Sequence, residues 1–257
     1  MARKPRAGKR RIEGIWQVDS GTARVIADPA RDGAYVLEVN DVPSSHVVLG
    51  APRVLEFEYM QWIAALLRPR PLSDAHIVHL GGAACSLARW AADVWPSSRN
   101  TVVEIDGALS RLVREVFDIP ASVRSVVGEA RTLTHALAEG SVDVLIRDVF
   151  AGPATPRHLT TVEYFQACRR ALAPGGLYLA NCGDREGLPT ARAELAGLTE
   201  VFAHVAAVGP EEMLGGRAYG NILLLASDSP LPALSGVPAL MREASGLPAG
   251  RARRDGS

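Results

Sequence analysis

The stretch Ile77-Val78-His79-Leu80-Gly81-Gly82 decides the fold, because an apolar run there ends in paired glycines. A second apolar run, Thr101-Val102-Val103-Glu104-Ile105, ends in an acid that stands 23 residues after Gly81. Strand, glycine turn, helix, strand and acid is the order of the first half of a nucleotide-binding βαβ unit. Glycines let the backbone approach a ligand closely, and an acid at the end of the second strand suits a ribose diol. The stretch therefore predicts a nucleoside ligand before any reaction is known.

Downstream of this stretch, strand-like and helix-like patterns alternate. The strand-like runs cover 77–80, 101–105, 123–127, 142–147 and 177–181, and the helical segments that follow them cover 86–94, 109–117, 132–138, 161–172 and 190–198. Such alternation is typical of a parallel sheet with right-handed crossovers. The last two runs, 201–208 and 221–226, are joined by a loop whose length suits a hairpin, so the final strand should be reversed. We predict an α/β fold with a mostly parallel, seven-stranded Rossmann-like sheet, as in class I methyltransferases.

The residues before this sheet show a different pattern. Short runs of β-type composition, separated by Asp, Gly and Pro, predict a small antiparallel β-domain that must pack on the main domain or on a partner chain. A helical face with Leu55, Tyr59 and Trp62 follows it. We therefore expect a basic disordered tail at 1–11, a small β-domain plus helix at 12–72, a nucleoside-binding domain at 73–229 and a disordered C-terminal tail at 230–257.

Composition limits the function classes. The 257 residues are 47% hydrophobic, which predicts a sizeable core, and the 28 basic and 28 acidic residues balance. Six of the basic residues lie in residues 1–11, so the rest of the chain carries a net charge of −6, which argues against a nucleic-acid partner. No run of about 18 apolar residues predicts a membrane span, and three scattered cysteines form no disulfide or zinc pattern. We expect a cytoplasmic protein with no membrane association.

Polar or glycine-rich residues follow each of the five strand-like runs. They are Gly81-Gly82, Glu104-Ile105-Asp106, Gly128-Glu129-Ala130, Asp148 and Asn181. Ligands of open α/β sheets bind outside the carboxyl ends of the strands, so these tips meet at one edge. Five such tips in register behind apolar strands predict a nucleotide crevice.

At this point the chain resembles the spermidine synthase (polyamine aminopropyltransferase) family, from about residue 15 to about residue 227. The resemblance rests on Leu80-Gly81-Gly82, Val103-Glu104-Ile105-Asp106, Gly128-Glu129-Ala130, the run 142–148 and the run 159–165. It implies a small-molecule nucleoside ligand, namely S-adenosylmethionine, its decarboxylated form or methylthioadenosine. It also implies a homodimer and a reaction without a metal.

The resemblance also implies a role for each matching residue in nucleoside binding. Glu104 would accept hydrogen bonds from the ribose hydroxyls, and Glu129 stands where the family usually has the Asp that takes the adenine amino group. Gly81 and Gly82 would allow close backbone approach, and Ile105 and Ala130 stand beside these acids as further nucleoside contacts.

Three further residues would contact the acceptor. Asp148 matches the acid that helps to deprotonate the attacking amine, because an ammonium has no lone pair with which to attack. Tyr59 and Tyr164 would contact the substrate, although packing in the core is an alternative interpretation of both tyrosines.

Departures from the family pattern fall in the half that would hold a diamine. The glycine loop has Ala84 where the family has Asp, Ala151 replaces a second Asp, and the helix reads Tyr59-Met60-Gln61 in place of Tyr-His-Glu. An unpaired ammonium in a cleft costs several kcal/mol in desolvation, so dications need carboxylates. The sequence therefore predicts a spermidine synthase-like transferase with a degenerate diamine site and an atypical amine acceptor. The alternatives are a methyltransferase that uses S-adenosylmethionine and a non-catalytic nucleoside-binding or scaffold protein.

Overall fold

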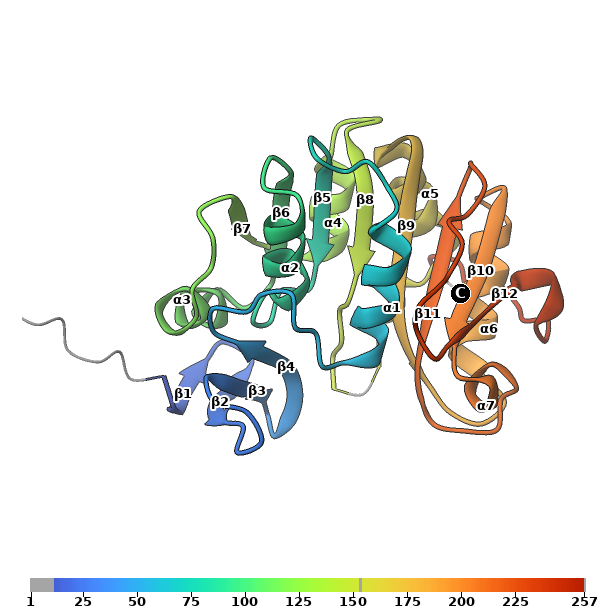
Figure 1. Ribbon diagram of the computed structural model, residues 1–257. Coiled ribbons are helices and arrows are strands. Elements are labelled where there is room, and N and C mark those ends of the chain that lie inside the picture. The colour runs from blue at the N-terminus through green and yellow to red at the C-terminus, as the bar shows by residue number, and fades with distance from the viewer. Residues whose placement is uncertain (1–11, 153, 257) are drawn as a thin grey trace, which may run out of the picture.

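The computed structural model describes residues 12–152 and 154–256, so the expected basic tail at 1–11 lies outside the described residues. Within them the chain forms a four-stranded antiparallel sheet and an eight-stranded, mostly parallel sheet (Figure 1). The small sheet contains, in order, β1 (Gly14–Val18), β2 (Gly21–Ala27), β3 (Ala34–Val39) and β4 (Val42–Val48). It lies beyond the carboxyl ends of the neighbouring main-sheet strands, where it forms one wall of the region expected to bind ligand (Figure 1).

The main sheet has the strand order β12-β10-β11-β9-β8-β5-β6-β7. Its strands are β5 (His76–Leu80), β6 (Arg99–Glu104), β7 (Val123–Val127), β8 (Val142–Arg147), β9 (Leu172–Asp184), β10 (His204–Gly209), β11 (Gly220–Ser227) and β12 (Leu240–Glu243). The strands β5 to β9 are parallel, whereas β11 runs antiparallel to both β9 and β10. The predicted α/β class and the reversed strand after a hairpin are confirmed.

Helices cover both faces of this sheet (Figure 1). They are α1 (Glu58–Leu67), α2 (Ser86–Val94), α3 (Gly107–Val116), α4 (Ala130–Ala136), α5 (Val162–Ala171), α6 (Pro189–Thr199) and the short α7 (Glu211–Leu214). On one face, α1 and α2 pack through Ile63, Leu66 and Trp90, and on the other face α5 and α6 pack through Phe165 and Leu195. A third apolar cluster joins the small sheet to α2 and α3, so the β-domain does pack on the main domain.

Two expectations about the end of the chain are wrong. The sheet has eight strands in the described residues, not seven, because β12 pairs antiparallel with β10. The strand comes from the segment 230–257 that we expected to be disordered, and the structure describes that segment as far as Gly256. The composition, rich in Pro, Gly, Ala and Arg, obscured the short apolar contacts, for example Leu247, that hold the segment against the domain.

Candidate active site

A cavity of about 1140 Å³ lies between the small sheet, α1 and the carboxyl ends of the parallel strands. Eight of the nine residues expected at the site line it: Tyr59, Gly81, Gly82, Glu104, Ile105, Glu129, Ala130 and Asp148. These residues are brought together from distant parts of the chain, since Tyr59 and Asp148 are 89 residues apart. The sheet topology is responsible, because parallel strands present all of their carboxyl ends at one edge.

The ninth residue, Tyr164, does not lie at the cavity. Its side chain is fully buried among the core residues beside Phe165, with ring centroids 6.0 Å apart. Tyr164 lies in the first turn of α5 within the core cluster, so the structure does not bring it together with the other expected site residues. Tyr59 is both buried and part of the cavity wall.

The turn after β5, which begins at Gly81, lies directly against Asp148, the acid that follows β8. Gly81 has φ +87°, and a Cβ on this residue would collide with the carbonyl oxygen of Asp148. The next residue, Gly82, is also confined, because a Cβ there would lie 2.7 Å from Val102 Cγ1. Only glycine satisfies the first position, both for its backbone conformation and for its closeness to β8.

Two non-glycine residues in the same turn also adopt left-handed backbone conformations. Ala83 has φ +38° and Cys85 has φ +57°. L-residues rarely adopt this conformation, so both residues are strained in the turn. Ala84 lies between them, is fully buried and donates its backbone N–H to Ser45 Oγ of β4 at 3.1 Å. Ala84, the position at which the family has an acid, therefore lies beneath the small sheet and does not form part of the cavity wall.

Glu104, at the end of β6, holds this turn in place. Its Oε2 accepts the backbone N–H groups of Gly82 at 2.9 Å and Ala83 at 3.2 Å, and its Oε1 accepts the N–H of Asp106 at 3.1 Å. A carboxylate has about four acceptor positions, so these three bonds leave one on Oε1 for a further donor. The residue can take one hydroxyl from a ligand without losing any contact that shapes the turn.

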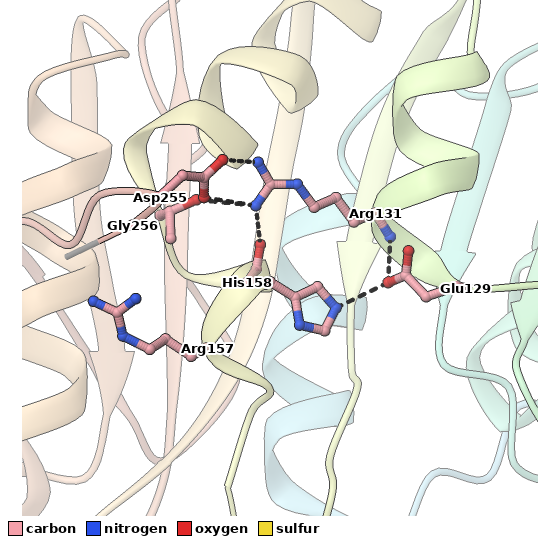
Figure 2. Close-up of a pocket in the computed structure, with 7 residues that line it drawn as sticks. Glu129, Arg131, Arg157, His158, Asp255 and Gly256 are labelled. Atoms are coloured by element: carbon pink, nitrogen blue, oxygen red, sulfur yellow. Dashed lines mark hydrogen bonds and ion pairs between the residues drawn. The ribbon is translucent and has the colours of Figure 1, made fainter.

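Glu129 is already fully hydrogen-bonded. It caps α4 by accepting the N–H groups of Arg131 at 2.8 Å and Thr132 at 2.7 Å, together with the Thr132 hydroxyl and His158 Nε2. Burial raises the pKa of Glu129, but these hydrogen bonds outweigh that effect and lower it to about 2. Figure 2 shows the carboxylate facing the His158 ring. A ligand amino group could reach this carboxylate only by replacing one of these donors.

Asp148 follows β8 and occupies the centre of the cavity wall. Its Oδ2 accepts the Tyr59 hydroxyl at 2.7 Å, and its Oδ1 accepts Asn181 Nδ2 at 2.9 Å. Burial raises the pKa of Asp148, while these two donors lower it in part, and the net direction is upward. A carboxylate of raised pKa that is held by two neutral donors is suited to accept a proton from a bound nucleophile.

Behind this acid lies an ion pair that the sequence pattern did not predict. Arg147 and Glu194 are both fully buried, and Arg147 Nη1 lies 2.7 Å from Glu194 Oε2. The guanidinium also donates to the carbonyl oxygens of Leu159 at 2.8 Å and Asn181 at 3.2 Å, so it links β8, β9 and α6 directly behind Asp148. The available signal was an arginine inside the otherwise apolar run 142–147.

One wall of the cavity is mainly apolar. Phe57, Met60 and Trp62 line it from α1 and the segment before it, Met213 lines it from α7, and Phe150 and Tyr219 line it from loops. Ala151, at the position of the second family acid, is also part of this wall. Carboxylates at Glu56 and Glu58 lie at exposed positions on the rim, and Glu56 is paired with Arg31 at 3.3 Å.

Two other polar groups at the cavity are unreactive. Burial lowers the pKa of His79 to about 4, and its Nε2 lies 3.0 Å from Asn100 Oδ1, so the ring is neutral near pH 7. Burial raises the pKa of Cys85 to about 12, which keeps its thiol protonated. Among residues 12–152 and 154–256, no His, Cys, Asp or Glu cluster has a metal-binding arrangement.

The fold and this site together define an α/β protein of the class I methyltransferase type. Among solved structures, the chain is similar to a probable spermidine synthase from Corynebacterium glutamicum, with 45% identity, coverage of 96% of this chain and 98% of that one, and a TM-score of 0.88. The chain belongs to the spermidine synthase, or polyamine aminopropyltransferase, family, whose named members are transferases. No family model matches it.

More distant similarities agree with this assignment. Spermidine synthase from Thermotoga maritima (18% identity, TM-score 0.62, 84% of this chain and 72% of that one) shares the fold. So does human methyltransferase-like protein 13, solved with SAH (22% identity, TM-score 0.57, 70% of this chain and 86% of that one). Among curated proteins, the polyamine aminopropyltransferase of Neisseria meningitidis is 26% identical over 155 residues, 57% of each chain. The matched region thus spans little more than half the length of that relative.

Proposed function

We propose that the protein is a transferase that binds an S-adenosyl nucleoside in this cavity and moves an aminopropyl group from decarboxylated S-adenosylmethionine to an amine. One observation carries the proposal: Asp148, oriented by Tyr59 and Asn181, lies directly against the Gly81 turn in the cavity that also contains Glu104. Alkyl transfer from a sulfonium to an amine requires a proton acceptor beside the turn that holds the nucleoside, so this contact supports the proposal.

The sulfonium donor supplies an electrophilic carbon and a neutral thioether leaving group. The nitrogen lone pair of the acceptor forms the new C–N bond, and the electrons of the broken C–S bond remain on sulfur. Asp148 takes a proton from the amine, while Tyr59 and Asn181 stabilise the ionised carboxylate before that transfer. The buried side chains of Met60, Trp62 and Met213 give the nitrogen an apolar surround on this side of the cavity.

The nucleoside half of the proposal rests on Glu104, whose remaining acceptor position on Oε1 suits one ribose hydroxyl. Gly82, Ile105 and Ala130 supply the surrounding wall. Glu129 acts on the ligand indirectly, because its carboxylate is occupied by the cap of α4 and by His158. The adenine contact that the family resemblance implies for Glu129 would require His158 to move.

We further propose that the acceptor is an amine with one cationic end and an apolar body. Met60 and Ala151 stand in the wall where the family pattern has His and Asp, so Asp148 is flanked by apolar surface there. A second ammonium placed against that surface would be desolvated without a partner, at a cost of several kcal/mol.

A cytoplasmic homodimer is also part of this proposal. The three cysteines are buried free thiols, which fits a reducing compartment. In the small sheet, β1 and β4 are the edge strands, and each exposes a large apolar side chain, Ile15 and Val42. A second copy is an occupant that would cover them. In the described part of the chain, no helix has the length and apolar character to cross a membrane.

A calorimetric titration with methylthioadenosine and S-adenosylhomocysteine tests the nucleoside site. We expect binding to the wild type, loss of that binding in Glu104→Ala, and retention in Glu139→Ala, a surface control remote from the cavity. If no adenosyl-sulfur compound binds, the aminopropyltransferase and methyltransferase hypotheses are both contradicted, and a scaffold role remains.

A turnover assay then separates the transferred groups. The wild type is supplied with S-adenosylmethionine or its decarboxylated form and with a panel of monoamines and diamines. Aminopropyl transfer to monoamines is the expected result. Methyl transfer from S-adenosylmethionine would favour the methyltransferase alternative, which the missing diamine residues also favour. Efficient turnover of putrescine would contradict the proposal that the acceptor has one cationic end.

A further inference from the structure

The segment after β12 crosses the face of the main domain that carries α5 and α6, and it ends beside the cavity. Arg192 of α6 donates to the carbonyl oxygen of Ala249, and a Cβ on Gly250 would collide with the backbone of Arg192, so the segment lies directly on α6. Arg253 then pairs in parallel with Thr161, and its carbonyl oxygen accepts the N–H of Val162 at 3.0 Å. These backbone contacts fix Asp255 beside the start of α5.

From Asp255, a chain of polar contacts leads to the cavity wall (Figure 2). Both carboxylate oxygens of Asp255 accept from the Arg131 guanidinium, and Arg131 Nη1 also donates to the His158 carbonyl oxygen at 2.8 Å. The His158 ring in turn contacts Glu129 Oε1 at 3.0 Å. Both His158 and Glu129 line the large cavity. Asp255 is therefore linked to His158 in the cavity wall through Arg131, and to Glu129 through Arg131 and His158.

We propose that Asp255 is a positioning residue for the nucleoside site, acting through Arg131 to hold His158 and Glu129 in place. The inference rests on the proposed nucleoside function of the cavity. It goes beyond that function because it assigns a role in donor binding to a residue that does not touch the cavity, from a segment outside the parallel sheet.

The geometry distinguishes this contact from an ordinary surface ion pair. Exposed pairs contribute little because two long side chains must be ordered for one screened attraction. Here Arg131 is only 19% exposed, and its guanidinium is held by four oxygen acceptors from three residues, Asp255, His158 and Thr161. The Asp255 backbone is also fixed, because its N–H donates to Glu163 Oε2 at 3.0 Å. The carboxylate is thus held in place before it orients the arginine.

Titration of the full chain with methylthioadenosine tests the proposal. We expect Asp255→Asn to weaken binding about three- to fivefold, the range that the loss of one partly exposed charged contact produces. Asp255→Glu should recover most of the affinity. The matched control is Arg254→Ala, which breaks the neighbouring ion pair with Glu200 on the same segment and should leave affinity unchanged. In turnover assays, the KM for the donor should rise in Asp255→Asn while kcat and the KM for the acceptor remain constant.

A double-mutant cycle identifies the route of the effect. If Asp255 acts through Arg131, then Arg131→Ala with Asp255→Asn should bind no more weakly than Arg131→Ala alone. The proposal is overturned by wild-type affinity in Asp255→Asn, by additive effects in the cycle, or by equal weakening in Arg254→Ala. If the wild type itself binds no methylthioadenosine, the proposed function fails first and this inference fails with it, which is a different result.

Discussion

At the scale of single residues, the hydrogen bonds around Asp148 set its chemistry. Burial raises the pKa of this carboxyl, and the donors from Tyr59 and Asn181 favour its ionised form and so lower the pKa in part. The balance matters because, in the proposed reaction, only the ionised form can take a proton from the acceptor. If Asp148 has this role, the rate rises with pH through the pKa of Asp148, and the two donors determine where that rise occurs.

Removal of the Tyr59 hydroxyl should shift the pH at which the rate rises. In Tyr59→Phe the ionised carboxylate loses one donor, so the pKa of Asp148 rises and the acidic limb of the kcat/KM profile shifts to higher pH. The measurement is kcat/KM against pH for the wild type, Tyr59→Phe and the remote control Tyr35→Phe. An unchanged limb, or one shifted to lower pH, would contradict the assignment of Asp148 as the proton acceptor.

A second residue-scale feature is the strain in the glycine turn. Ala83 has φ +38°, where an L-residue is disfavoured by about 1–2 kcal/mol. Ala83→Gly should therefore stabilise the protein by about 1 kcal/mol and raise Tm by about 2–4 °C in calorimetry. Ala92→Gly, within α2, should have the opposite sign, because a helical backbone gains nothing from glycine. A lower Tm in Ala83→Gly would show that the turn is not strained at this residue.

At the scale of elements, the buried pair Arg147–Glu194 joins β8 to α6 behind the acid. Loss of one partner leaves a buried charge unpaired, so Glu194→Ala should reduce the free energy of unfolding by about 3–5 kcal/mol. The control is Glu200→Ala at the C-cap of the same helix, which breaks the exposed pair with Arg254 and should cost about 1 kcal/mol or less. Urea denaturation of both variants measures the difference, and similar values for the two would contradict it.

The same elements show what the sequence could and could not predict. Period and turn residues located β5 to β9 and the tip residues, because each depends on a local run such as 77–82. Glu129 is the N-cap of α4, and Tyr164 lies in the first turn of α5. The direction in which a side chain points at the start of a helix is not determined by the local sequence pattern. The pairing of Arg147 with Glu194, and of Asp255 with Arg131, joins residues far apart in the chain, and no local signal names the partner.

At the scale of the whole molecule, Asp106 joins the two sheets. Its carboxylate caps α3 through the Leu109 N–H at 2.7 Å and also accepts from the backbone and hydroxyl of Ser20 in the β1–β2 turn, at 2.8 and 2.6 Å. Burial raises the pKa of Asp106, but these bonds lower it overall, so they are made to the ionised form. The residue that caps α3 is therefore also the attachment of the small sheet.

Asp106→Ala should destabilise the protein by about 2–3 kcal/mol, more than loss of a cap alone, because the Ser20 donors lose their partner as well. Amide hydrogen exchange in β1 and β2 should accelerate more than exchange in β9. Glu115→Ala, exposed on the same helix, is the control and should change neither value. Uniform acceleration across both sheets would indicate that Asp106 supports the main domain only.

The position of Asp255 also has a consequence for the order in which the molecule is completed during synthesis. Its contact with Arg131 closes a separation of 124 residues, and the parallel strands that carry the cavity wall are made long before it. Chains fold progressively from the N-terminus, so a nascent chain that has passed β11 has a sheet and a glycine turn but lacks this last contact. If Asp255 positions the nucleoside site as proposed, full affinity would then appear only once this residue has been added, well after the strands of the cavity wall have been made.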